Sequence, residues 1–164
     1  MTFIFKDTRV TGIEETWIFD PDYTQSFLAD YKTERDGSNS PAASKLIATQ
    51  TQPNLAEIRY FTYVRLDGRD LGNLPVRDFV ATVSDKRLSF TFVVDLPAPV
   101  DPLHQALAVE IYDHDYYAAI VLAEQEPVRF RNMQGVACEP RMREDVENAY
   151  FGNVYPEEIT LACR

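Results

Sequence analysis

Residues 79–96, which read FVATVSDKRLSFTFVVDL, decide the fold class. Apolar side chains occupy every second position on both sides of a central polar group: Phe79, Ala81 and Val83 before it, and Leu88, Phe90, Phe92, Val94 and Leu96 after it. Successive side chains of a β-strand point to opposite faces, so this alternation predicts two half-buried strands. The polar group Asp85-Lys86-Arg87 between them is predicted to form a tight connection.

The same alternation recurs at Leu107, Val109 and Ile111. Enrichment in Val, Phe, Tyr and Thr predicts further strands at residues 2–10, 12–19, 58–66, 117–123, 127–132, 135–141 and 158–163. Asp67-Gly68 predicts a hairpin turn. Residues 97–102 contain three prolines, which lack the N–H of a central strand, so a loop that crosses between sheets or follows an edge is expected there.

Helices are expected mainly in residues 21–57. In 21–34, Tyr23, Phe27, Leu28 and Tyr31 fall on one helical face. Asp20 is the predicted N-cap, and Pro21 is the predicted first helical residue.

A second short helix is predicted to begin at Ser40-Pro41 and to end near Gln50, and residues 144–150 are predicted to add one or two helical turns. The combined pattern predicts a mainly β protein whose residues 1–164 form one antiparallel β-sandwich domain. Its broad architecture is expected to be immunoglobulin-like, with a helical insertion near residues 21–57.

The charge balance narrows the choice of partners. The chain of 164 residues has 26 acidic and 16 basic residues, a net charge of −10. Nucleic acid and anionic membrane surfaces are therefore excluded as expected partners, because both are bound through clustered Lys and Arg. Direct membrane insertion is not expected either, since no run approaches about 18 consecutive apolar residues. The first residues do not resemble a secretory signal, which fits an intracellular protein or a mature secreted one.

Cys138 and Cys163, the two cysteines, lie 25 positions apart, which excludes a CxxC redox or zinc pair. Two alternatives stay open at this point. They are independent buried thiols, as in cytosolic proteins, or one disulfide formed in an oxidising compartment.

The chain contains no nucleophile elbow and no phosphate-binding glycine loop, so a non-enzymatic protein is expected. The most concentrated polar group is Asp113, His114 and Asp115, at the end of an alternating strand. Carboxylate and imidazole donors together suit a divalent transition metal. The alternative is a strand-end turn in which an Asp caps backbone amides and the neighbouring tyrosines pack over the core. Asp20 and Tyr117 are candidate contacts to a ligand or partner; for Asp20 the helix cap is the simpler alternative.

Several short segments resemble a bacterial family of periplasmic proteins of unknown function, described as periplasmic components of ABC-type transport systems for metals. The matching segments are FIFKD at 3–7, TWIFD at 16–20, YFTYVRLDG at 60–68, Tyr112-Asp113 with Tyr116-Tyr117, Cys138, and EITLAC at 158–163. They span nearly the whole chain in the expected order.

The resemblance implies a periplasmic location, and Met1 would then begin a mature sequence without its signal peptide. The family's usual His-Pro-His group before the first strand is replaced here by Met1-Thr2. The resemblance also implies a Cys138–Cys163 disulfide and a non-enzymatic accessory or binding role in transport of a divalent metal such as nickel, cobalt or zinc. Membrane transporter components are the expected partners. The alternative function is an interaction module that docks on a membrane transporter without binding a ligand.

Overall fold

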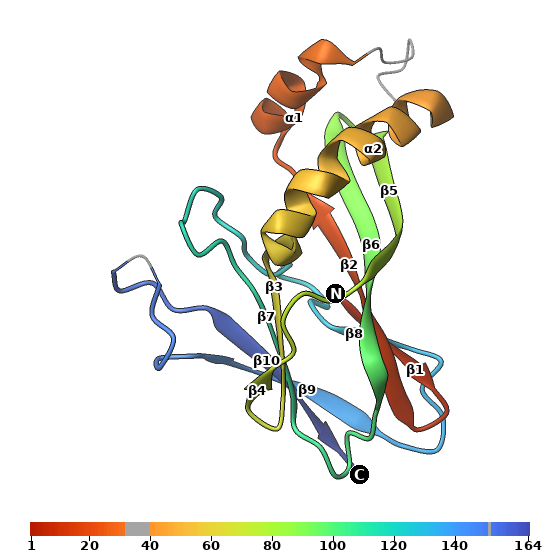
Figure 1. Cartoon of the computed structure of the whole chain (residues 1–164), viewed down its shortest axis with the longest axis vertical. Coiled ribbons are helices and arrows are strands. Elements are labelled where there is room, and N and C mark those ends of the chain that lie inside the picture. The colour runs from red at the N-terminus through yellow and green to blue at the C-terminus, as the bar shows by residue number, and fades with distance from the viewer. Residues whose placement is uncertain (32–39, 151) are drawn as a thin grey trace.

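The computed structural model describes residues 1–31, 40–150 and 152–164, which form a mainly β fold with two five-stranded, largely antiparallel sheets (Figure 1). In spatial order, the first sheet contains β5 (Val76–Ser84), β6 (Arg87–Val100), β2 (Arg9–Ile18), β1 (Thr2–Lys6) and β8 (Arg129–Arg131). The second sheet contains β4 (Arg69–Asp70), β3 (Thr62–Leu66), β7 (Leu107–Ile111), β10 (Glu157–Cys163) and β9 (Cys138–Glu144). The β1–β8 pair is parallel.

The β5–β6 hairpin has the register that the alternating pattern predicts, with Val83 opposite Leu88 and Ser84 opposite Arg87. Asp85 and Lys86 form the two-residue turn, and both have positive φ angles, 51° and 61°. A two-residue hairpin of this kind requires such angles, because they match the twist of the strands. Asp67-Gly68 likewise turns the chain between β3 and β4, as predicted.

Both sheets contribute side chains to one hydrophobic cluster. Its fully buried members include Phe3, Ile13, Phe90 and Phe92 from the first sheet and Val64, Val109 and Ile159 from the second. Since alternate residues of a strand face opposite ways, the neighbours of these second-sheet residues lie on the outer face of that sheet.

Two α-helices, α1 (Pro21–Phe27) and α2 (Pro41–Glu57), lie at the end of the molecule where β5 and β6 meet (Figure 1). Asp20 caps α1 by accepting the Tyr23 N–H at 2.8 Å, and Ser40 caps α2 through the Ala43 N–H. The hydroxyl of Ser44 donates to the Ala81 carbonyl and ties α2 to β5. No helix among the described residues has the length and hydrophobicity needed to cross a bilayer.

The helix boundaries differ from the prediction. After α1 the chain forms a 3₁₀ turn, η1 (Leu28–Asp30), and the predicted helical residues 32–34 lie outside the described part. α2 continues past Gln50 to Glu57, because Leu55 is buried and packs in the core. Tertiary packing therefore outweighs the helix-breaking tendency of Pro53.

Two predicted elements are absent from the described chain. Residues 117–123 are irregular and form no strand; Tyr117 is 98% exposed and Val121 85% exposed, so their side chains have no sheet to pack on. Residues 144–150 form no helix: Glu144 ends β9, a turn follows, and Tyr150 makes a bridge with Val154. The Asp145 carboxylate accepts the Glu147 N–H, and this local bond favours a turn over a helix.

The expected loop at 97–102 is also partly wrong, because β6 runs on through two prolines to Val100, which pairs with Val10. β5 pairs with β6 only as far as Val94, so the prolines occupy a stretch with a free edge, where their missing N–H is tolerated. The crossing between the sheets is made by residues 101–106.

A buried carboxylate links the two sheets. Glu15 on β2 is 1% exposed and accepts hydrogen bonds from the Thr62 hydroxyl of β3 at 2.8 Å and from Trp17 Nε1 at 2.9 Å. Burial raises the pKa of Glu15 to about 7, and the hydrogen bonds from Trp17 and Thr62 offset only part of that effect.

The Glu15→Gln variant is expected to be less sensitive to pH than the wild type. A raised carboxyl pKa means that the folded protein holds the proton more tightly than the unfolded chain. The contribution of Glu15 to stability is therefore full below 4.5, the ordinary pKa of a glutamate in an unfolded chain, and is lost as the pH rises to about 7. Urea unfolding should show the variant gaining roughly 2–3 kcal/mol relative to the wild type over this interval. Glu14→Gln, at the neighbouring position, is the control; curves for Glu15→Gln that run parallel to the wild type would contradict the assignment.

Candidate functional site

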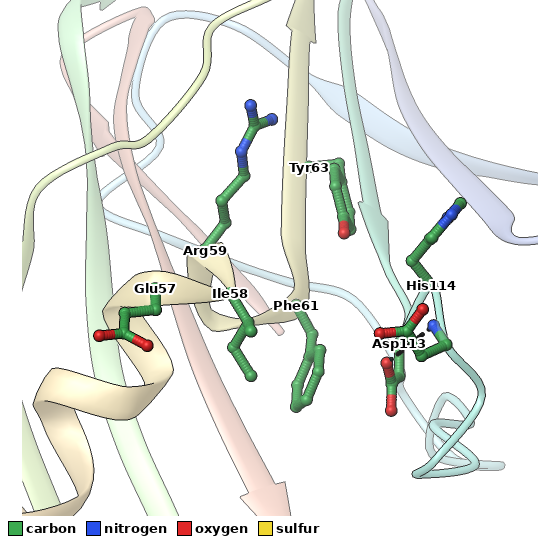
Figure 2. A pocket seen from close by; sticks show the side chains of 8 residues that line it. Glu57, Ile58, Arg59, Phe61, Tyr63, Asp113 and His114 are labelled. Carbon is green, nitrogen blue, oxygen red and sulfur yellow. Dashed lines mark hydrogen bonds between the residues drawn. The ribbon is translucent and has the colours of Figure 1, made fainter.

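A pocket of about 200 Å³ lies between the end of α2 and the loop after β7 (Figure 2). Its lining consists of Glu57, Ile58, Arg59, Phe61, Tyr63, Asp113, His114 and Asp115. We call it the α2–β7 pocket. It contains all three residues of the predicted metal group, together with one acid, Glu57, from a distant part of the sequence.

A left-handed turn forms one wall of the α2–β7 pocket. Arg59, Tyr60 and Phe61 of the 3₁₀ turn η2 (Arg59–Phe61) have φ angles of 55°, 51° and 52°. Each such non-glycine residue costs about 1–2 kcal/mol. Burial of Tyr60 against the core ring of Phe92 helps to offset the strain. The turn directs the chain from α2 into β3 and places Arg59 in the lining of the pocket. The Arg59 guanidinium pairs at 2.8 Å with Asp70, which lies outside that lining. Strained backbone of this kind clusters at functional sites.

The three predicted metal ligands line the pocket but play different parts. Asp113 is buried and accepts backbone N–H groups from Asp115, Tyr117 and Ala118 at 3.1, 2.9 and 2.9 Å. These bonds agree with the alternative prediction for Asp113, a strand-end turn in which the Asp caps backbone amides. They also use carboxylate lone pairs that a metal ion would need. The side chains of His114 and Asp115 are exposed, and Figure 2 shows the His114 ring turned away from the Asp113 carboxylate.

The two other candidate contacts lie apart from the pocket lining. Asp20 acts as the N-cap of α1. Tyr117 projects from the irregular loop after β7, and its backbone N–H donates to the Asp113 carboxylate.

A second group of acids was missed by sequence reasoning. Within the part of the chain that the structure describes, one set of three metal-capable side chains has ligand atoms within 4.8 Å of one another: Glu110, Asp145 and Glu158. All three are buried. A single nitrogen, Nη2 of Arg65, lies 2.8, 2.8 and 2.7 Å from their oxygens, and Arg143 Nε donates to Glu158 at 2.6 Å. We call Arg65 and the three acids the Arg65 cluster.

The protonation states of the Arg65 cluster follow from its geometry. Burial, followed by the interaction with Asp145, raises the pKa of Glu110 to about 7, and Arg65 offsets only part of that rise. Burial also disfavours the charged forms of Asp145 and Glu158, yet hydrogen bonds hold the pKa of both below the usual range; Asp145 receives them from Asn148 and Arg65, and Glu158 from Arg143 and Arg65. With Glu110 protonated, the two ionised acids balance Arg65 and Arg143.

The cluster lies on the outer face of the second sheet. Glu110 on β7 is directly opposite Tyr63 on β3 and Glu158 on β10, and Glu158 is opposite Arg143 on β9. Beside it is a larger cavity of about 560 Å³, lined by Tyr63, Arg65, Gly68, Asp70, Tyr112, Arg143, Asp145, Glu147, Asn148 and Glu158. In the sequence, the cluster is marked only by a charged residue at an outer-face position of β3, β7, β10 and β9. An ordinary strand with one face in water shows the same pattern, so the cluster could not be recognised from it.

A disulfide joins Cys138 and Cys163, whose Cα atoms lie 4.1 Å apart. The two residues are directly paired on the neighbouring strands β9 and β10. The bond therefore links the last strand of the chain to an edge strand of the second sheet, on the elements that also carry Arg143 and Glu158 of the cavity.

Comparison with known proteins gives a family. The model of a family described as protein of unknown function (DUF1007) matches residues 1–151. The chain is also 31% identical over 104 residues to the uncharacterized 15.5 kDa protein in the trpE 3′ region of Spirochaeta aurantia, an alignment that covers 63% of this chain and 74% of that protein. No solved structure is significantly similar to the chain. The chain therefore belongs to the DUF1007 family of proteins of unknown function.

Proposed function

We propose that the protein is a non-enzymatic periplasmic accessory or binding protein of a transport system for a divalent transition metal such as nickel, cobalt or zinc. The observation that carries the proposal is the α2–β7 pocket, whose lining includes His114, Asp115 and Glu57. The Cys138–Cys163 disulfide supports the location, because such bonds persist in oxidising compartments. The hydrophobic cluster shared by the sheets supports their packing as an immunoglobulin-like β-sandwich.

The donor chemistry favours the α2–β7 pocket over the Arg65 cluster as the metal site. The cluster offers three carboxylates, but the Arg65 guanidinium already lies within 2.8 Å of all three and supplies the cation. It also lacks nitrogen ligands, which nickel, cobalt and zinc favour. The pocket has an imidazole and carboxylates on exposed, rotatable side chains. Such ligands suit a protein that takes up a metal ion and passes it to a partner.

Asp113 has a positioning role in this proposal. Its bonds to three backbone N–H groups hold the turn on which His114 and Asp115 stand. Since groups that orient metal ligands influence affinity, removing this cap should loosen the site.

A second candidate function is docking on a membrane transporter without ligand binding. The observation that favours it is the exposure of two apolar side chains, Tyr117 and Val121, on the loop that follows the same turn. Exposed aromatic and aliphatic side chains of this kind are typical of interaction surfaces. In Figure 1 this loop stands away from the body of the molecule.

Titration calorimetry with nickel, cobalt and zinc chlorides tests the metal proposal. We expect binding of at least one ion, with affinity lowered about tenfold or more in His114→Ala and in Asp115→Asn, since each removes a ligand. His104→Ala is the matched control, because His104 is exposed, pairs with Asp101 at 3.2 Å and lies on another loop. Its affinity should equal that of the wild type.

Two results would contradict the metal proposal. One is the absence of heat and of any thermal shift with all three ions. The other is equal loss in the His104 and His114 variants, which would indicate non-specific binding by surface histidines. Either result leaves docking through Tyr117 and Val121 as the function to pursue.

A further inference from the structure

We propose that the 560 Å³ cavity beside the Arg65 cluster is a binding site for a small organic carboxylate, held by Arg65 and Arg143. This site goes beyond the proposed metal function. It shares only Tyr63 with the lining of the α2–β7 pocket.

Hydrogen-bond donors outnumber free acceptors on the buried side of the cavity wall. The oxygens of the two buried acids in the cavity wall are already used: both oxygens of Glu158 accept from arginines, and both oxygens of Asp145 accept N–H groups. The contacts of Arg65 with the three acids all involve Nη2, which shares its two N–H groups among them. Among the described residues, its Nε and Nη1 donate to no protein atom. The cavity therefore has spare donors and few spare acceptors, which suits a ligand that accepts hydrogen bonds.

The unused N–H groups are accessible. Within the described chain, no side-chain nitrogen or oxygen atom that is buried lacks a partner, so the unbonded nitrogens of Arg65 are reached by solvent. The Arg65 side chain is 22% exposed and that of Arg143 is 73% exposed. Both line the cavity, and Glu158 lies between them and bonds to each. Arginine binds a carboxylate through the paired N–H groups of its guanidinium, and both arginines of the cavity wall carry such a group.

The charge around the cavity permits an anion at this place. Arg65 and Arg143 are balanced by Asp145 and Glu158 while Glu110 is protonated, and Asp70 is paired with Arg59. Glu147 is the remaining acid of the lining, and it is exposed to solvent. A bound carboxylate would therefore lie beside side chains whose charges nearly cancel, although the whole chain has a net charge of −10.

The shape and the walls favour an organic ligand over an inorganic ion. The cavity is within the range of about 300–1,000 Å³ found for small-molecule sites. Tyr63 and Tyr112 stack with their ring centroids 4.5 Å apart and give it an aromatic wall. An organic carboxylate can place its charged end on the arginines and its apolar part against these rings.

Affinity should depend on pH through Glu110. Arg65 and Tyr63 from β3, Tyr112 from β7, Glu158 from β10, Arg143 from β9 and Asp145 from the turn after β9 surround this acid. Since its pKa is raised to about 7, loss of its proton adds a negative charge beside Arg65 as the pH rises. Carboxylate affinity should therefore fall between about pH 6 and pH 8 in the wild type and stay constant in Glu110→Gln.

The test is an NMR titration of the full ¹⁵N-labelled chain with sodium succinate, sodium benzoate, sodium phosphate and sodium chloride. We expect one of the two carboxylates to bind with a dissociation constant of about 1 mM or tighter, with shift changes at Tyr63, Tyr112 and Asn148. Arg143→Gln, at an exposed position, should fold normally and weaken binding about tenfold or more. Arg65→Lys should weaken it similarly, because lysine keeps the charge but loses the fork. Arg129→Gln, outside the cavity, is the control and should bind as the wild type does.

Several results would overturn the assignment. They are the absence of saturable binding of either carboxylate, unchanged affinity in Arg143→Gln, and shift changes confined to residues outside the cavity. Tighter binding of phosphate than of both carboxylates would assign the arginines to inorganic oxyanions and would also refute the proposed ligand class. Because the metal titration uses other residues, each proposal can fail without the other.

Discussion

Arg65→Met is expected to lower the free energy of unfolding by about 3–5 kcal/mol. The substitution removes the cation that lies within 2.8 Å of three buried carboxylates on separate segments of the chain. Glu158 would keep Arg143 and Asp145 would keep Asn148, but both buried acids would lose the cation that they share and would have to take up protons or move into water. The effect is large mainly because buried carboxylates left without a cation carry an uncompensated desolvation penalty. The attraction lost in the ion pairs themselves is the smaller part. Urea unfolding near neutral pH measures it.

Arg143→Gln is the matched control for Arg65→Met. Arg143 also bonds to Glu158, but its side chain is largely exposed, so the loss should be below about 1 kcal/mol. The effect of Arg65→Met should become smaller at acid pH. There the carboxyl groups are protonated in the unfolded chain, so the wild type gains less from holding them ionised beside Arg65. A loss below about 1 kcal/mol at neutral pH would show that the cluster does not hold these strands together.

Loss of the Cys138–Cys163 disulfide is expected to lower the free energy of unfolding by about 3–4 kcal/mol. The bond closes a loop with a sequence separation of 25, and the chain-entropy model assigns this stabilisation to the restricted unfolded state. β9 pairs with the rest of its sheet only through β10, so its free edge offers no other support. Chemical unfolding of the Cys138→Ser, Cys163→Ser double variant measures the effect.

The wild type in a reducing agent is the control for the double variant, and both should lose stability equally. A thiol assay on the denatured wild type should find no reactive thiol. Two reactive thiols in protein isolated from an oxidising compartment would contradict the disulfide and remove the main support for a periplasmic location.

The sheet hairpins could be predicted from the sequence because their contacts are local. Asp85 and Lys86 separate two alternating segments, and the pairing of Ser84 with Arg87 follows from that turn. Helix starts were predictable for the same reason, since Asp20 and Ser40 each cap a helix through a residue three positions later. The predicted strand at 117–123 was wrong because propensity cannot show whether a neighbouring strand exists to pair with it.

The candidate functional residues also differ in whether their contacts are local along the chain. Asp113, His114 and Asp115 stood out because they are consecutive, and the capping bonds of Asp113 are local too, since they reach residues only two to five positions later. Arg65 lies 45, 80 and 93 positions from the three acids that it binds. Nothing in any one of these segments marks it as part of a buried charge network.

The amino-acid sequence by itself determined the strand-rich class, the hairpin turns and the helix caps, because alternation and capping act between residues close along the chain. Only the tertiary structure decided that Glu57 and the Asp113 turn line one pocket and that Arg65 contacts three acids beside a cavity. The physical reason is that pairing of β3, β7, β10 and β9 sets which outer-face side chains become neighbours. That register depends on the packing of both sheets around one core, which no local pattern encodes.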